Sequence, residues 1–198
     1  MMRRIVALVL LSPILLSLAL FFLTSLPLHA GELLHSYVNE EDDHFVLHLD
    51  MRINADVDTI YGVLMDFSKM HLVNDSIISS TLLESKKQKH QLHFITEGCV
   101  WFFCRKIKQL VTVTELGQGY IMSTTDPAES DLRYGRTLWQ LIDEGETTRV
   151  KYNADYVPDF WVPPFIGSTI FQSRMLEEGK KTVNGLERLS APASTANQ

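Results

Sequence analysis

Two acidic side chains next to apolar segments are the first candidates for chemistry in this sequence. Asp66 follows an apolar pattern of helical spacing and stands beside Phe67, whereas Glu97 follows a strand-like segment and precedes Gly98. A carboxyl group in an apolar cavity has a raised pKa and can act as a general acid or base. Both residues are therefore candidates for proton transfer. The simpler interpretations are that Asp66 caps a helix or is solvated, and that Glu97 ends a strand before a turn.

The two cysteines, Cys99 and Cys104, bracket a short segment rich in aromatic residues, Val100 to Phe103. If this segment forms a tight hairpin, the two cysteines face each other at the Cα separation that a disulfide requires. Closing so small a loop stabilises the fold by only about 2 kcal/mol, so the bond would mainly fix local shape. The spacing is not C-x-x-C, which argues against a redox-active pair. The aromatic side chains either belong to the core or form a tip that enters a membrane or covers a ligand entrance.

The histidines are considered next because pairs of them can bind metal ions. His90 and His93 are three positions apart, so on a strand they point to opposite faces. His44 and His48 share a face but have no obvious carboxylate or cysteine partner nearby in the sequence. We interpret all four as lone surface histidines and expect neither a metal site nor a cofactor.

The strongest basic cluster consists of Arg105, Lys106 and Lys108. It either contacts lipid phosphates or forms the solvated edge of a strand. The sequence contains no nucleophile elbow, phosphate-binding loop, zinc-binding spacing or dinucleotide-binding fingerprint. No motif therefore indicates catalysis, and a binding protein is expected rather than an enzyme.

Residues 1–30 have the organisation of a secretory signal peptide. Arg3 and Arg4 precede an uncharged apolar run from Ile5 to about Leu28, and the segment ends at the small residue Ala30. Cleavage would release the mature chain into the periplasm. The apolar run is about as long as a membrane-spanning helix, so an uncleaved anchor in the inner membrane is the alternative. Thiols are oxidised outside the cytosol, which favours a disulfide between the two cysteines.

The remainder of the chain is long enough for one domain with a substantial core, at ~168 residues. The formal net charge of the whole chain is −6, and it becomes more negative without Arg3 and Arg4. An acidic chain without a large basic patch is not expected to bind nucleic acid. Residues 191–198 are small and polar, and we expect them to form a disordered tail.

The elements that position these residues follow from hydrophobic periodicity. Alternating apolar residues predict a first strand over residues 44–54. Helical spacing after the N-cap Asp56 predicts a short helix to about Phe67, with a second turn over residues 70–73. The later strands are expected at residues 77–83, 91–96, 102–114, 120–124, 134–142 and 148–157. Gly145 suits the turn between the last two strands, and a long helix is expected from about Pro164 to Leu189.

This order of elements resembles the helix-grip fold of the START-like (SRPBCC) superfamily, which includes polyketide cyclases and coenzyme-Q-binding proteins. The resemblance covers about residues 38–189 and is carried by the segments INADVDTIYGVLMDFSKM, YGRTLWQLIDEGETTRVKYNADYVPDFWVPP and RMLEEGKKTVNGLERL. The sequence departs from the family pattern at Leu72, Val73 and Asn74, where many members have Trp-x-Pro. The resemblance implies an α+β domain over residues 31–190, in which a curved antiparallel sheet of about seven strands wraps around the C-terminal helix.

The resemblance also implies a cavity between sheet and helix that holds a hydrophobic molecule such as a lipid, a quinone or a polyketide-like compound. A curved sheet gripped by one helix has a concave face that large side chains or a ligand must fill. The residues predicted to line it are Phe94, Val111, Val113, Leu138, Val150, Tyr152, Tyr156, Ile166, Ile170 and Phe171. The simpler interpretation is that these residues form an ordinary core.

Three functions are consistent with this sequence. The first is a carrier or sensor of a hydrophobic ligand, with contact to a membrane surface. The second is an enzyme of the cyclase or dehydratase kind, in which Asp66 or Tyr152 transfers protons. The third is an interaction module whose concave face is filled by its own side chains.

Overall fold

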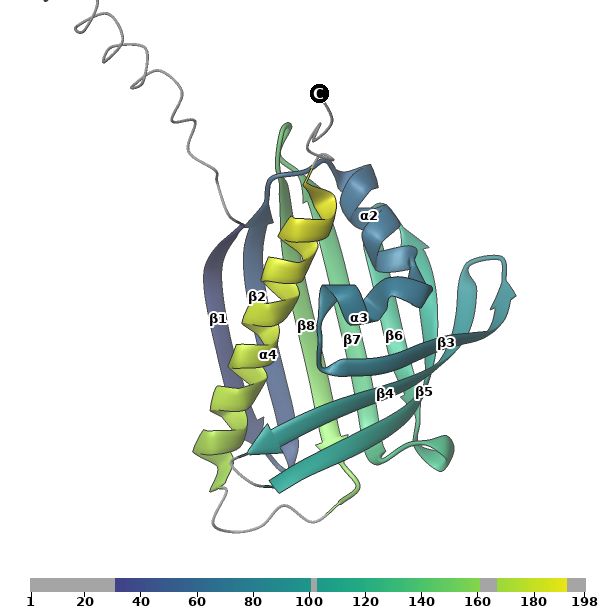
Figure 1. Cartoon of the computed structure of the whole chain (residues 1–198), viewed down its shortest axis with the longest axis vertical. Coiled ribbons are helices and arrows are strands. Elements are labelled where there is room, and N and C mark those ends of the chain that lie inside the picture. The colour runs from purple at the N-terminus through teal and green to yellow at the C-terminus, as the bar shows by residue number, and fades with distance from the viewer. Residues whose placement is uncertain (1–30, 101–102, 161–166, 192–198) are drawn as a thin grey trace, which may run out of the picture.

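An eight-stranded antiparallel sheet wraps around one long helix in the computed structural model (Figure 1). The structure describes residues 31–100, 103–160 and 167–191. The strands are β1 (Glu32–Glu41), β2 (His44–Ile53), β3 (Ile77–Lys86), β4 (Lys89–Val100), β5 (Phe103–Gly117), β6 (Tyr120–Asp126), β7 (Leu132–Asp143) and β8 (Thr148–Pro158). The helices are α2 (Val57–Met65), α3 (Met70–Val73) and α4 (Gly167–Ser190), with 3₁₀ turns η1 (Phe67–Lys69) and η2 (Pro127–Glu129).

The strand order is β1-β2-β8-β7-β6-β5-β4-β3, so β2, the first strand predicted from the sequence, pairs with the last one. Helix α4 lies across the concave face of the curved sheet, and α2 and α3 cover the same face beside it (Figure 1). This arrangement is the predicted α+β helix-grip architecture.

The eighth strand, β1, was not predicted. It pairs with β2 along nearly its whole length, from Glu32 opposite Arg52 to Glu41 opposite His44. Most of its side chains are exposed or half-buried, and Leu33 and Val38 pack against the core. Backbone pairing with β2 holds this strand in place, and it has no fully buried face. For this reason its sequence shows no clear apolar alternation. The acidic segment before His44 is the turn that joins these two strands.

The short helix α2 begins as the sequence predicts. The Asp56 side chain accepts a hydrogen bond from the backbone N–H of Thr59 at 2.8 Å, which satisfies one of the unpaired donors of the first turn. Ile60 and Leu64 lie one turn apart and are buried against the sheet. The predicted N-cap and the predicted short second helix, α3, are therefore confirmed.

The C-terminal half of α4 packs tightly on the rest of the fold. Val183 and Leu186 are buried, at 2% and 0% exposure. A Cβ atom at Gly185 would collide with the backbone carbonyl of Val73 in α3, and one at Gly179 would lie 2.9 Å from the Leu49 side chain. These two glycines therefore permit a close approach of α4 to α3 and β2, and their cost in helix propensity is offset by that packing.

The last hairpin also follows the sequence-based prediction. Gly145 has φ +88° in the turn between β7 and β8, a conformation that glycine adopts without strain. The segment before α4 that includes Pro164 and Ile166 lies outside the described residues, as do residues 1–30 and all of the predicted tail after Ala191. Among the helices in the described ranges, none is both long and apolar enough to cross a bilayer.

Candidate functional site

The concave face of the sheet brings together most of the residues predicted to line a ligand site. Pairing places Val150 and Tyr152 of β8 opposite Met51 and Leu49 of β2, on the side that α4 covers. Val111 and Val113 of β5 share this face with Leu92 and His90 of β4, and Phe94 lies two positions beyond Leu92. Ile170 and Phe171 are on the helix that covers the face.

Leu138 does not belong to this group. It pairs with Asn153, an exposed residue, whereas its neighbour Trp139 pairs with Tyr152. Because successive residues of a strand alternate between faces, Leu138 points to the convex side. The predicted lining residue on β7 is therefore replaced by Trp139, one position along the chain.

One part of the concave face is fully packed, and we call it the closed end. It lies near α2 and the C-terminal half of α4, and the side chains that form its centre have no accessible surface. These are Leu49, Met51, Ile53, Ile60, Leu92, Val150 and Leu186, each at 0% exposure. Here the predicted lining residue Val150 is ordinary core, as are Val111 and Val113.

The other part, which we call the open end, lies along the concave face toward the end of β8 and the first half of α4. Its large side chains keep accessible surface. Those that pack on the core are Phe94, Trp139, Tyr152 and Tyr156. Ile170 and Phe171 of α4 are also half-buried. The ring centroids of Trp139 and Tyr152 are 4.2 Å apart, and those of Phe45 and Phe171 are 4.4 Å apart.

Hydroxyl groups accompany the aromatic rings at the open end. The hydroxyl oxygens of Tyr152 and Tyr156 are 3.1 Å apart, and those of Ser123 and Thr137 are 2.5 Å apart. Burial raises the pKa of Tyr152 well above its usual range and also raises the pKa of Tyr156. Both phenols are therefore neutral over the physiological range and can donate hydrogen bonds to a ligand, but neither is suited to act as a general base.

The two acidic candidates lie away from this face. Asp66 follows α2 at the surface, where hydrogen bonds from Lys69, at 2.7 Å, and from Ser68 lower the pKa of its carboxyl group. A lowered pKa is the opposite of what proton transfer near neutral pH requires. Glu97 is exposed and pairs with Lys106 across the β4–β5 ladder. The structure therefore places neither carboxyl group with Tyr152.

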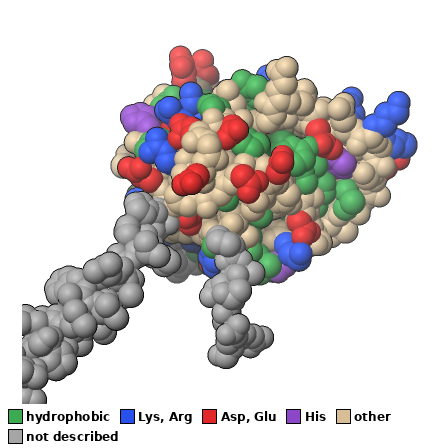
Figure 2. All heavy atoms as spheres, turned by 90° about the horizontal axis from the view of Figure 1, so that it is seen from above, with side chains coloured by type: hydrophobic (Ala, Val, Ile, Leu, Met, Phe, Trp, Pro, Cys, Tyr) green, Lys and Arg blue, Asp and Glu red, His purple; other side chains and the backbone are tan. Residues whose placement is uncertain are grey.

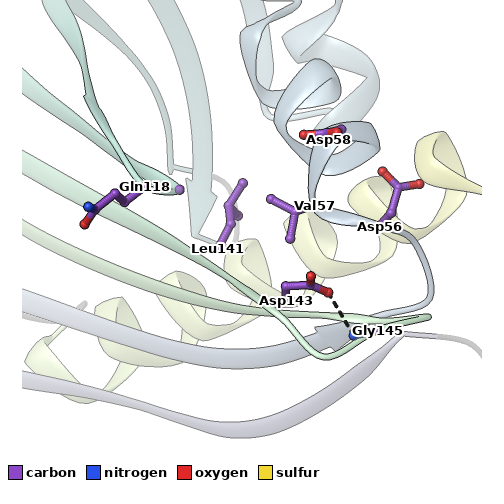
Figure 3. Close-up of a pocket in the computed structure, with 8 residues that line it drawn as sticks. Asp56, Val57, Asp58, Gln118, Leu141, Asp143 and Gly145 are labelled. Atoms are coloured by element: carbon purple, nitrogen blue, oxygen red, sulfur yellow. Dashed lines mark hydrogen bonds between the residues drawn. The ribbon is translucent and has the colours of Figure 1, made fainter.

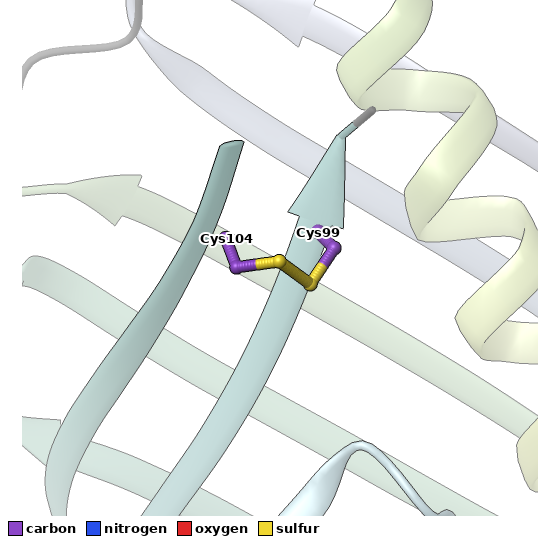
Figure 4. The surroundings of a disulfide bond; sticks show 2 residues. All are labelled: Cys99 and Cys104. Atoms are coloured by element: carbon purple, nitrogen blue, oxygen red, sulfur yellow. A yellow bond between two sulfur atoms is a disulfide. The ribbon is translucent and has the colours of Figure 1, made fainter. Parts of the chain in front are cut away.

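The disulfide between Cys99 and Cys104 joins β4 to β5 close to the end of that hairpin (Figure 4). The two residues are directly opposite in the strand register, with Cα atoms 4.0 Å apart. Strand β4 contacts α4, so the bond holds the hairpin beside the open end. Trp101 and Phe102, the proposed aromatic tip, lie outside the described residues.

The basic cluster is divided between the two faces of β5. Lys106 and Lys108 are exposed on the convex face, whereas Arg105 is half-buried on the concave face, opposite Gly98. The guanidinium carbon of Arg105 lies 4.3 Å from the ring centroid of Phe160. Alternation along the strand therefore separates a lysine pair in solvent from an arginine at the open end.

Three of the four histidines, His44, His48 and His90, have side-chain partners, contrary to the sequence-based interpretation of lone residues. His90 is buried, its Nε2 lies 2.8 Å from a Glu115 carboxylate oxygen, and its Nδ1 lies 3.0 Å from the hydroxyl of Ser85. Tyr61 of α2 donates a hydrogen bond to the other oxygen of Glu115. This network fastens α2 to β4 and β5 at the closed end, and its partners come from distant parts of the chain.

The other pair of histidines also has partners across the sheet. His44 Nδ1 lies 2.7 Å from the Asp155 carboxylate, and His48 Nδ1 lies 2.6 Å from the Asn153 side-chain oxygen. The partners that the sequence did not reveal are thus on β8, next to β2 in space. His90 and His93 point to opposite faces as expected, and no cluster of three or more metal-ligating side chains occurs within the described ranges.

Comparison with solved structures shows the same architecture in several proteins of low sequence identity. An aromatase/cyclase, Zhui, from Streptomyces sp. R1128 aligns with a TM-score of 0.64 and 10% identity, over 77% of this chain and 98% of that chain. A START superfamily protein from Mycobacterium smegmatis aligns at 0.60 and 14% identity, over 73% and 96%. A STAR-related lipid transfer protein from Xanthomonas axonopodis aligns at 0.54 and 14%, over 80% and 99%.

The chain has the START-like fold. No protein-family model matches the sequence, and no curated protein matches it either. At 10–14% identity these neighbours establish the START-like architecture and not a shared ligand or activity.

A separate surface cleft of about 400 Å³ lies where α2 begins, at the far side of the closed end (Figure 3). Asp56, Asp58 and Asp143 stand on its wall with Leu141 and Gln118. Asp56 caps α2, and Asp143 accepts a hydrogen bond from the backbone N–H of Gly145 at 2.8 Å. These two carboxylates thus stabilise local backbone turns, and the cleft contains none of the residues predicted for function.

The same end of the START-like domain has an acidic surface. Viewed from this end, Asp and Glu side chains are spread across the middle of the surface, and hydrophobic side chains lie among them (Figure 2). Lys and Arg side chains gather toward the margins. This distribution agrees with the net charge of −6, and the face seen in this view has no continuous basic surface for a polyanion.

Sequence reasoning missed two features of the concave face. One is the position of Arg105 on the concave face, apart from Lys106 and Lys108, with which it was grouped as a single basic cluster in the sequence. The period-2 alternation from Val111 back through Gln109 and Ile107 to Arg105 could have revealed it, because these four residues share a face. The other is the row of hydroxyl groups on β6 and β7, for which the sequence gives no signal beyond the same alternation.

Proposed function

We propose that the protein is an exported carrier or sensor that binds a hydrophobic small molecule, of the lipid class, at the open end of its concave face. One observation carries this proposal: Tyr152 and Tyr156 lie on the concave face, where Tyr152 contacts the Trp139 ring and the two hydroxyl groups are neighbours, and yet both side chains keep accessible surface. Side chains in such positions border space that protein atoms do not fill, which is typical of a ligand site.

The composition of the open end supports the same conclusion. Aromatic rings from β7, β8 and α4 offer a broad apolar surface, and a few hydroxyl groups are available to orient a ligand. Ligand sites commonly combine these two features. Two of the structural neighbours carry lipid transfer or aromatase/cyclase in their names, so the fold accommodates both uses.

The test uses a matched pair of substitutions on β8. Ala154 faces the concave side between the two tyrosines and is buried, whereas its neighbour Asn153 faces the convex side and is exposed. Ala154→Met adds side-chain volume to the open end, and Asn153→Met adds the same side chain to the outer surface. We expect the first to weaken binding of a fluorescent fatty acid by tenfold or more and the second to leave it unchanged.

Mass spectrometry of an organic extract of the purified wild-type protein provides a second readout, and we expect a co-purified lipid. The proposal is wrong if the wild-type protein neither contains nor binds a hydrophobic molecule. Equal effects of the two substitutions on binding would also contradict it, because the change would then not depend on the concave face.

Export is the second part of the proposal. It rests on the composition of residues 1–30, and the disulfide agrees with an oxidising compartment. We expect the mass of the chain recovered from a periplasmic fraction to correspond to a start near Gly31. An intact N-terminus in the membrane fraction would instead indicate an uncleaved anchor, and recovery from the cytosol alone would refute export.

A further inference from the structure

Arg105 stands out on the concave face because its side chain has no polar partner in the part of the chain that the structure describes. Within the described residues its guanidinium group forms no ion pair and no hydrogen bond, and the Nε atom is buried without a partner. A buried donor that lacks a partner is costly, and each such group in a folded protein requires an explanation. The contact found for Arg105 is with the ring of Phe160.

The contact with Phe160 leaves the guanidinium group available for binding. A guanidinium that lies over an aromatic ring uses its flat face, and its N–H groups at the edge remain free to bind a carboxylate or a phosphate through two parallel hydrogen bonds. Directly across the ladder, Gly98 shares the face of Arg105, and a Cβ atom there would meet nothing within 4 Å. There is therefore open space beside the charged group.

The neighbouring charges do not neutralise Arg105. Glu97 and Lys106 lie directly opposite each other in the β4–β5 ladder, on the other face of these strands. The Asp131 side chain accepts a hydrogen bond from the backbone N–H of Lys108. A disulfide joins Cys99, which follows Gly98 in the sequence, to Cys104, which precedes Arg105. It fixes the two strands on which this position depends.

We propose that Arg105 binds the anionic head group of an amphipathic ligand whose apolar tail lies along the open end. This inference rests on the proposed function and narrows its ligand class from hydrophobic molecules in general to those with one carboxylate or phosphate group. The tail lies against the aromatic residues Tyr152, Tyr156 and Phe171, and the head group faces Arg105 beside the Cys99–Cys104 bond.

The experiment compares two probes that differ only in charge. The purified protein is titrated with cis-parinaric acid, a fluorescent fatty acid, and with its methyl ester. We expect the wild-type protein to bind the acid about tenfold more tightly than the ester, which is the size of effect expected for hydrogen bonds to a charged group. Arg105→Met should weaken binding of the acid about tenfold and leave binding of the ester unchanged.

Two further variants make this result specific. Lys106→Met removes the same charge from the other face of β5 and should change neither affinity. Arg105→Lys keeps the charge but loses the planar fork, so it should retain part of the preference for the acid. Circular dichroism and the melting temperature establish that each variant is folded, and Arg105→Lys tests the inference if Arg105→Met fails to fold.

Competition with inorganic phosphate distinguishes an amphiphile from a free anion. We expect millimolar phosphate to leave parinaric acid bound. Displacement by phosphate would show that the site binds the anion alone, and the inference would be wrong.

The outcomes also separate this inference from the proposed function. Equal affinity of the wild-type protein for acid and ester, or equal losses in Arg105→Met and Lys106→Met, overturns the role of Arg105 and leaves the hydrophobic site standing. Failure of the wild-type protein to bind either probe overturns both.

Discussion

The closed and open ends of the concave face are built from the same strands and the same helix, yet their side chains are covered to different extents. At the closed end, Leu49 and Leu186 have no exposed surface, and glycines let α4 approach its neighbours closely. At the open end, Tyr152 and Phe171 keep accessible surface although they contact other rings. Complete packing at one end stabilises the fold, and this permits incomplete packing at the other.

The two ends also differ in how their charged groups are paired. At the closed end, Glu115 is hydrogen-bonded to both Tyr61 and His90. At the open end, Arg105 has an aromatic contact and no hydrogen bond within the described residues. A satisfied network is what a structural role requires, whereas an unsatisfied cation is suited to a ligand of opposite charge.

The largest expected difference is between two truncations on α4. Leu186→Ala should lower the free energy of unfolding by about 3 kcal/mol, because it leaves a cavity in a fully packed region. Phe171→Ala removes more atoms but should cost only about 1 kcal/mol, because the ring is only half-buried. Urea denaturation measures both values.

A reversed order of these two costs would show that the open end is ordinary core. Binding of parinaric acid provides the complementary readout, since Phe171→Ala should weaken it and Leu186→Ala should not. Asn184→Ala, at an exposed position of the same helix, is the control for changes in helix propensity.

The disulfide gives the next largest effect. Replacing Cys99 and Cys104 together by serine should lower the free energy of unfolding by about 2 kcal/mol, the value expected for closing so short a loop. It should also reduce the preference for the acid over its methyl ester, because Arg105 then stands on a less constrained hairpin. An unchanged preference in the double variant would mean that the position of Arg105 does not depend on the bond.

The smallest effect concerns Glu115 at the closed end. Hydrogen bonds from Tyr61 and then His90 lower the pKa of the Glu115 carboxyl group in the folded protein. These bonds therefore stabilise the fold fully at a pH above the pKa that Glu115 has in the unfolded chain. Their contribution is lost as the pH falls through the lower pKa of the folded protein. Glu115→Gln should therefore cost about 1.5 kcal/mol at pH 7. The difference from the wild-type protein should shrink below about pH 4.

The measurement for Glu115 is urea denaturation at several pH values, with the exposed Glu97→Gln as control. A pH-independent cost would attribute the effect to packing instead of charge. Changed binding of parinaric acid in Glu115→Gln would contradict the separation of the two ends.

Much of the fold could be predicted because local patterns report it directly. The alternation over residues 44–54 indicated β2, the side chain of Asp56 indicated the start of α2, and Gly145 indicated the last turn. β1 could not be predicted in the same way, because its side chains are largely exposed and its stability comes from pairing with β2. Sequence patterns of propensity and periodicity reveal a strand through its buried side chains, and a strand held mainly by backbone hydrogen bonds has few of them.

The candidate site was predicted less well, because it depends on which face each side chain occupies and on partners distant in the chain. Leu138 was predicted to lie on the concave face, but Trp139 lies there instead, since a shift of one residue reverses the face. His90 appeared to be isolated because Glu115 lies 25 positions away and Tyr61 comes from a different element.

The sequence by itself determined the acidic charge, which follows from composition, and the order of the elements from β2 onward, because each of those elements is marked by residues close in the chain. Only the tertiary structure decided that the concave face has a packed end and an open end. The same structure paired Glu115 and left Arg105 without a hydrogen-bond partner within the described residues. The physical reason is that coverage and charge pairing are properties of surfaces brought together from α4, β5 and β8, and no single segment carries them.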